Sequence, residues 1–206
     1  MKRFMYHTAA LAVAVALVAC SGSKGRSGPA YGTGDPSLAA PNSNGSVNPF
    51  LTDGQAVVRA LDAIEARTGK PLRVTLISAN AMGGLTIDVQ ERASHGKLDR
   101  YQVAPNGTIL GPVPEKLVTA RGTVATAADI ERQAFDPRAL AFAHLAQTER
   151  DAIAKANDRG ARVAEWDVGG IRPGDRRLIY IQTARGNLFA VIDPQFHIVR
   201  IRESGT

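Results

Sequence analysis

Cysteine is nearly absent from this chain of 206 residues, in which Cys20 is the only one. Exported domains of this size often use disulfides to reinforce a small core. A single thiol excludes any disulfide within the chain. We therefore expect packing alone to hold the fold together.

A long apolar run is also missing. The apolar run Thr8–Ala19 has twelve residues, which reach about 18 Å as a helix, whereas the hydrocarbon core of a bilayer is about 30 Å thick. The run is too short for a permanent transmembrane helix. Because it follows Lys2 and Arg3, it predicts a cleaved secretory signal peptide over residues 1–19.

The residues that close this run, Leu17-Val18-Ala19-Cys20, resemble the lipobox of bacterial lipoproteins. The resemblance implies cleavage between Ala19 and Cys20 and a lipid on the Cys20 thiol, with fatty acyl chains such as palmitate as the membrane anchor. Ser21, rather than Asp, follows the cysteine, which in this family favours the outer membrane, facing the periplasm, with the cell surface as a second orientation. The alternative is an ordinary cleaved signal in which Cys20 has no role.

Acidic residues are in modest deficit. Lys2 and Arg3 leave with the signal peptide, so the mature chain has 23 basic and 19 acidic residues, a net charge of about +4. No basic stretch is interleaved with aromatic residues, so we expect no nucleic acid partner. A modest positive charge suits anionic lipid headgroups or cell-wall polymers without defining a specific site.

Large apolar side chains are scarce between Ser21 and Pro49, where Gly, Ser, Pro, Asn and Ala dominate. Such a segment buries too little surface to offset the entropy of ordering. We expect residues 20–50 to be the lipidated cysteine and a disordered tether. About thirty residues of this composition span roughly 30 Å on average, so the tether lets the folded part reach targets above the membrane.

A first α+β unit is predicted over residues 51–114. Thr52 to Gln55 form a candidate capping box for a helix over Asp53–Thr68, which Gly69 and Pro71 end. Short strands are expected after it, before Gly111–Pro114 closes the unit. They are centred on Leu72–Ser78, Leu85–Val89, Tyr101–Val103 and Thr108–Leu110.

A second unit of the same order is predicted over residues 136–206. A connector, 115–135, precedes it and contains a candidate short helix from Thr126 to Gln133. Asp136-Pro137 is a helix start, and an alanine-rich helix is expected over Ala139–Asn157. The strands expected after it are Val163–Val168, Leu178–Thr183, Leu188–Ile192 and Phe196–Arg202.

Equivalent elements of the two units recur at a nearly constant spacing. Val74 and Val163 lie 89 residues apart, and the later strands align at 88 to 92. This spacing predicts an internal duplication, with chance agreement as the alternative. The fold class is therefore α+β, with two repeated units of one helix packed on a small antiparallel sheet. Because each unit is small, we expect the two to pack into one body.

The second unit resembles the PepSY domain of secreted and membrane-anchored bacterial proteins. Its helix Asp151–Ala156, its strand Val163–Val168 and its terminal hairpin Phe189–Val199 carry the resemblance, whereas the first copy lacks the usual Asp before its last turn. Two copies would cover Thr52 to Glu203. The resemblance implies peptidase inhibition or binding of envelope partners, and it supplies no catalytic residues.

Candidate catalytic and metal-binding side chains are sparse. His95, His144 and His197 stand singly in the sequence, so we expect no metal and no cofactor. Ser94, His95 and Asp99 are too close in one loop for a triad. The sequence therefore predicts no catalytic residues.

Three carboxylates, Asp88, Glu91 and Asp99, are a conceivable acid–base group. Arg92 and Arg100 beside them favour ion pairs instead.

Two aromatic residues, Trp166 and Tyr180, are the candidate binding anchors, with core packing as the favoured alternative for Trp166. The sequence thus favours a non-enzymatic outer-membrane lipoprotein that binds an envelope protein through a sheet face or an edge strand, as a peptidase inhibitor or an assembly or secretion accessory. The alternatives are a small envelope hydrolase, which needs polar side chains in a cleft, and a cell-wall or lipid carrier, which needs a cavity between helix and sheet.

Overall fold

The computed structural model describes residues 48–119, 122–169 and 177–203. These residues all belong to one compact unit. The predicted signal peptide, the cleavage site at Ala19 and Cys20, and the tether as far as residue 47 lie outside the described residues.

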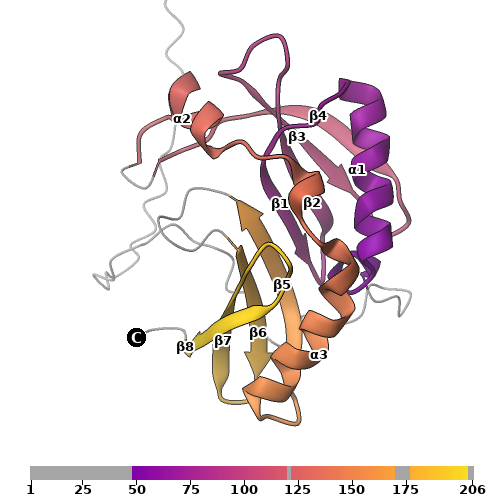
Figure 1. Ribbon diagram of the computed structural model, residues 1–206, viewed down its shortest axis with the longest axis vertical. Coiled ribbons are helices and arrows are strands. Elements are labelled where there is room, and N and C mark those ends of the chain that lie inside the picture. The colour runs from indigo at the N-terminus through magenta and orange to yellow at the C-terminus, as the bar shows by residue number, and fades with distance from the viewer. Residues whose placement is uncertain (1–47, 120–121, 170–176, 204–206) are drawn as a thin grey trace, which may run out of the picture. The chain divides into compact units, whose positions relative to one another are not determined.

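Two helix-then-strands segments make up most of the described chain (Figure 1). The first consists of α1 (Gly54–Thr68), β1 (Val74–Asn80), β2 (Gly84–Gln90), β3 (Leu98–Val103) and β4 (Ile109–Glu115). The short helix α2 (Ala127–Gln133) lies in the connector. The second consists of α3 (Leu145–Ala156), β5 (Arg162–Gly169), β6 (Arg177–Thr183), β7 (Gly186–Ile192) and β8 (Ile198–Glu203).

All eight strands form one antiparallel sheet in the order β4-β3-β2-β1-β5-β6-β7-β8. Neighbouring strands within each half are also consecutive in sequence, and β1 pairs with β5 to join the halves. In that pairing Ser78 lies opposite Asp167, at the centre of the five paired positions. The predicted α+β class is confirmed, and its antiparallel strands belong to one sheet.

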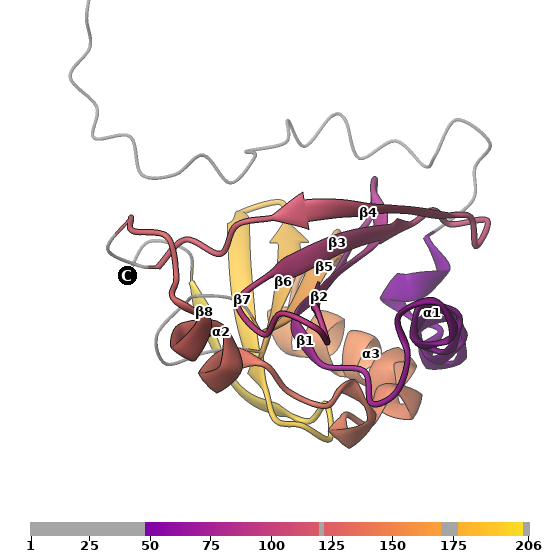
Figure 2. The ribbon, with the colours of Figure 1, turned by 90° about the horizontal axis from the view of Figure 1, so that it is seen from above.

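Helices α1 and α3 cover the same side of the sheet, as the view from above shows (Figure 2). Val57, Leu61 and Ile64 recur at helical spacing on α1 and are fully buried. The strands contribute alternate residues to the same core, such as Ile77 and Ala79 on β1. Alternation leaves the other residues of each strand on the opposite side, where neither long helix lies.

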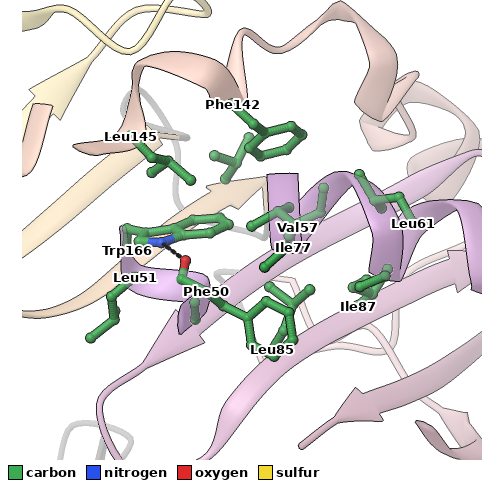
Figure 3. Packing of buried hydrophobic residues seen from close by; sticks show 14 of the residues in the cluster. Phe50, Leu51, Val57, Leu61, Ile77, Leu85, Ile87, Phe142, Leu145 and Trp166 are labelled. Atoms are coloured by element: carbon green, nitrogen blue, oxygen red, sulfur yellow. Dashed lines mark hydrogen bonds between the residues drawn. The ribbon is translucent and has the colours of Figure 1, made fainter. Parts of the chain in front are cut away.

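The segment just before α1 fills the centre of this core (Figure 3). The indole nitrogen of Trp166 donates a hydrogen bond of 2.9 Å to the carbonyl oxygen of Phe50. The side-chain amide of Asn48 donates to the carbonyl oxygens of Asn80 and Gly84. Folded structure was predicted to begin at Thr52. It includes residues 48–50, which were assigned to the tether.

Helix boundaries differ from prediction where tertiary contacts compete with local signals. Asp53, not Thr52, caps α1 by accepting from the Gln55 amide. The cap at Asp136 opens only a 3-10 turn, and α3 begins at Leu145. The intervening chain bends because the Ala141 amide donates to a carbonyl of the β7–β8 turn, while Phe142 enters the core. The predicted start of α2 is confirmed, with a complete capping box at Thr126.

Strand β4 runs through the Gly111–Pro114 segment that was predicted to end the first unit. Proline is tolerated there because β4 is an edge strand with no partner on its outer side among the described strands. The last strand begins later than predicted, at Ile198, because Phe196 adopts a positive φ of 64° and is buried in the core.

Replacing Trp166 by Phe tests the contact between the two halves. The variant keeps an aromatic ring but loses the indole donor, which leaves the Phe50 carbonyl buried without that partner. We expect the free energy of unfolding to fall by about 1–3 kcal/mol, measured by urea denaturation. Val199→Ala, at a residue 65% exposed, is the control and should change it by less than about 0.5 kcal/mol. If Trp166→Phe changes the free energy of unfolding as little as Val199→Ala does, the hydrogen bond from Trp166 to Phe50 does not stabilise the core as described.

Candidate functional site: the helix-free face of the sheet

The side of the sheet away from α1 and α3 carries the strand residues that alternate with the core. It is called here the helix-free face because neither long helix lies on it, although the short helix α2 covers one end. Cross-strand pairs define it, because residues directly opposite each other share a face. On the first half these pairs include Ser78 with Thr86 and Asp88 with Arg100. On the second half they include Tyr180 with Phe189 and Phe189 with Arg202.

The connector covers one end of this face. Leu98 of β3 packs there with Leu117, Ala125 and Ile130 in a second, small hydrophobic cluster. Glu131 of α2 fixes the helix by accepting from the Gln90 side-chain amide at 2.7 Å.

The same carboxylate pairs with Arg73 at 3.3 Å and with His95 at 3.2 Å. The hydrogen bond from Gln90 is the main cause of the lowered pKa of Glu131. His95 therefore lies in a contact that holds the connector, beside Glu131 rather than in a triad with Ser94 and Asp99.

Asp88 is the buried charge of the face, at 2% exposure. The Arg100 guanidinium donates to both of its carboxylate oxygens, at 2.7 and 2.9 Å, and also pairs with Glu115 at 2.9 Å. Burial raises the pKa of Asp88, although Arg100 opposes the shift. Glu91 pairs separately with Lys97. The sequence favoured ion pairs of these carboxylates with Arg92 and Arg100. Arg100 does pair with Asp88, but the pair is buried on the Asp88 side rather than solvated. The three carboxylates do not form one acid–base group.

The second half of the face carries what we call the aromatic–arginine patch, formed by Tyr180, Phe189, Val191, Arg200 and Arg202. The rings of Tyr180 and Phe189 meet edge to face with centroids 4.8 Å apart, and both are half-buried. Arg200 lies opposite Val191 and Arg202 opposite Phe189, and both arginines are exposed. Apolar rings flanked by exposed guanidinium groups are the composition typical of protein-binding hot spots.

The two predicted anchors lie on opposite sides of the sheet. Trp166 is fully buried in the core, so the core packing favoured for it is confirmed and it does not contribute to a binding surface. Tyr180 lies on the helix-free face, where its binding role stays a prediction. Phe189 was missed, although it precedes the buried Ala190 in β7 and the alternation of that strand signals its position.

Both edges of the sheet carry features that oppose the addition of another strand. In β4, Pro112 and Pro114 have no N–H to offer a neighbour. In β8, Ile198 pairs with Ile192 and Arg200 pairs with Val191, so Val199 between them has no partner residue on β7. This extra residue forms a β-bulge beside Arg200 and Arg202. Prolines, bulges and charged side chains are the usual protection of edge strands. The two edges are therefore poorly suited to pairing with a strand of another chain.

A cavity of about 360 Å³ lies on the other side, between α1 and the β3–β4 turn. It is lined chiefly by Ala56, Ala60 and Ala63 of α1, by Phe50, and by Val103 and Ile109 of the hairpin, with Arg59 beside them. A lipid or cell-wall carrier needs a cavity between helix and sheet, which the alanine-rich composition of the second helix would allow. The structure places one at the first helix.

The histidines are not all isolated in space. His144 and His197 stack with ring centroids 5.7 Å apart. Their sequence positions gave no signal of this contact, because it depends on how α3 meets the β7–β8 turn. Within the described ranges, no group of three or more His, Cys, Asp or Glu side chains is placed to hold a metal.

No helix among the described residues is both long enough and apolar enough to cross a membrane.

Among solved structures, the fold is similar to that of a candidate lipoprotein from Clostridium difficile 630. The TM-score is 0.52 at 13% sequence identity, and the match covers 72% of this chain and 92% of the other. At this identity the similarity concerns the fold. No family model matches the sequence, and no curated protein matches it. The resemblance to PepSY domains therefore stays a prediction.

Replacing Arg100 by Met tests the charge balance of the face. Because the pKa of Asp88 is raised in the folded state, ionising it costs folding free energy. This cost is absent at pH values below 3.8, the ordinary pKa of the Asp88 carboxyl group. It is complete at pH values above the raised pKa of Asp88 in the folded protein. Without Arg100 the cost grows, and we expect a loss of about 3–5 kcal/mol at pH 7 that shrinks as the pH falls toward 4.

Urea unfolding of Arg100→Met and of the original protein, at several pH values from 4 to 7, measures the difference in their free energies of unfolding. Adding Asp88→Asn to Arg100→Met should restore most of the loss at pH 7 and abolish its pH dependence. A loss that is the same at both pH values would show that Asp88 is not the group responsible.

Proposed function

We propose that this chain is a lipid-anchored envelope protein that binds a protein partner through the helix-free face of its sheet. The observation that carries the proposal is the aromatic–arginine patch on an eight-stranded sheet whose two edges are protected. The mechanism is occlusion or scaffolding, as in a peptidase inhibitor or an accessory to envelope assembly or secretion, and needs no catalytic residue. The partner that fits has acidic and apolar side chains on one surface.

The proposed anchor is the lipid on Cys20. The lipobox-like residues before it support this anchor, and so does the similarity in fold to a candidate lipoprotein. Ser21 favours the outer membrane with the protein facing the periplasm. The polar segment up to residue 47 would then let the face meet partners at a distance from the bilayer.

The two halves of the sheet are proposed to be copies of one duplicated unit. Ser78 and Asp167, at the centre of the β1–β5 pairing, are 89 residues apart, the spacing at which the sequence halves align. The register shift that begins at Val74 in β1 recurs at Val163 in β5, at the same spacing. The pairing of β1 with β5 makes the helix-free face continuous across the two halves.

A carrier of lipid or cell-wall material is the second candidate, because one observation favours it. The cavity beside α1 is lined mainly by apolar and small residues, and its volume lies within the range of small-molecule sites. A hydrolase would instead need a cleft with polar side chains converging on it. The cavity residues therefore favour a carrier over a hydrolase as the alternative.

Replacing Cys20 by Ala tests the anchor. A lipid on Cys20 holds the protein to the membrane, so the variant should leave the membrane fraction and lose the mass of the lipid. Fractionation of cells followed by intact-mass spectrometry measures both. If the variant fractionates like the original protein, and the original carries no lipid mass, the lipoprotein assignment is wrong.

Reversing the charges of the patch tests the binding face. Arg200→Glu with Arg202→Glu should reduce capture of an envelope partner in intact cells by at least about tenfold, because like charges across an interface repel. The matched control is Arg150→Glu, at an exposed position on α3. Quantitative mass spectrometry after cross-linking gives the readout, and unchanged thermal unfolding confirms that each variant is folded. Equal losses in patch and control variants would contradict a role for this face.

A further inference from the structure

The stacked histidines lie where α3 begins and the β7–β8 hairpin turns. His144 ends the 3-10 turn before α3, and His197 precedes β8. The His144 Nδ1 lies 2.8 Å from the carbonyl oxygen of Gln195, and the His197 Nδ1 lies 3.2 Å from a carboxylate oxygen of Asp193. Both rings are exposed, His197 at 69% of its side chain.

These two contacts fix the tautomer of each neutral ring. A carbonyl oxygen and an ionised carboxylate accept hydrogen bonds and do not donate them, so each Nδ1 must carry the proton. The lone pair of each imidazole is therefore on Nε2. In metal sites, ligating histidines commonly donate their other N–H to a carbonyl or carboxylate in this way.

The backbone under both rings is well fixed. One carboxylate oxygen of Asp193 accepts from the amides of Gln195 and His197, which closes the turn. The Thr148 hydroxyl lies 2.6 Å from the carbonyl oxygen of Phe196, which ties α3 to the same turn. Because the backbone that carries both histidines is already fixed, the two side chains lose little conformational entropy when they bind one ion.

The separation of the rings is compatible with a shared ion. With metal–nitrogen bonds of about 2.0–2.1 Å, two imidazoles on one ion have ring centres roughly 4.5–5.5 Å apart. The ring centroids are 5.7 Å apart, so the two rings must move slightly closer to share an ion. The ring planes meet at 30°, so one ring must also rotate.

From these observations we infer that His144 and His197 form a two-imidazole site for a divalent transition-metal ion, through their Nε2 atoms. Imidazole ligands suit Cu²⁺, Ni²⁺ and Zn²⁺, with Cu²⁺ the tightest in the usual order. Two protein ligands leave the remaining coordination positions to water, so the bound ion exchanges with solution. This site is separate from the aromatic–arginine patch and does not depend on the proposed partner.

Titration with Cu²⁺ and Zn²⁺ by isothermal calorimetry tests the inference. The protein is the full chain carrying His7→Ala and Cys20→Ser, which removes the histidine and the thiol outside the described residues. We expect one ion per chain. His144→Ala or His197→Ala should weaken binding by about 100-fold, because two linked ligands gain affinity through effective concentration. His95→Ala, in a different contact, is the matched control and should leave the affinity unchanged.

A second measurement separates ligand loss from unfolding. Electron paramagnetic resonance of the Cu²⁺ complex should show two imidazole nitrogens in the parent chain and fewer in each single variant, while thermal unfolding without metal confirms that the variants are folded. The absence of saturable binding, full affinity in either His144→Ala or His197→Ala, or an equal loss in His95→Ala would each overturn the site.

Discussion

The main-chain pairing of β1 with β5 is the interaction on which the rest of the structure depends. Each half alone is a helix with four strands, too small to bury a large core. Pairing through five residue positions joins the halves into one sheet and brings both helices onto one core. Trp166 lies on the inner side of this junction, opposite Ala79, and its bond to Phe50 also fixes the chain that precedes α1.

The same junction determines what the other side of the sheet presents. Ser78 and Asp167 at its centre point away from the helices, between the ion pair of Asp88 on the first half and the aromatic rings on the second. Among the described strands, both edges of the sheet are protected against pairing with a further strand. On the second half of this surface the exposed guanidinium groups of Arg200 and Arg202 lie beside the apolar rings.

Sequence patterns predicted most elements because their causes are local. Alternation located the strands, and the pattern at Thr126 located the start of α2. The errors lie where distant contacts decide the structure. Phe50 is buried only because Trp166 and the two helices surround it, and β4 continues through two prolines only because it lies at an edge. The pairing of His144 with His197 likewise depends on tertiary packing that no spacing in the sequence encodes.

The account is tested most directly by site-specific photo-cross-linking in intact cells, with a photoreactive residue at position 180 on the helix-free face and, in a parallel chain, at position 150 on α3. We predict that position 180 captures one envelope protein, that position 150 does not, and that capture requires Cys20. Capture of that protein equally from both positions, or of no protein from position 180 while glycan or lipid co-purifies, would contradict binding through this face.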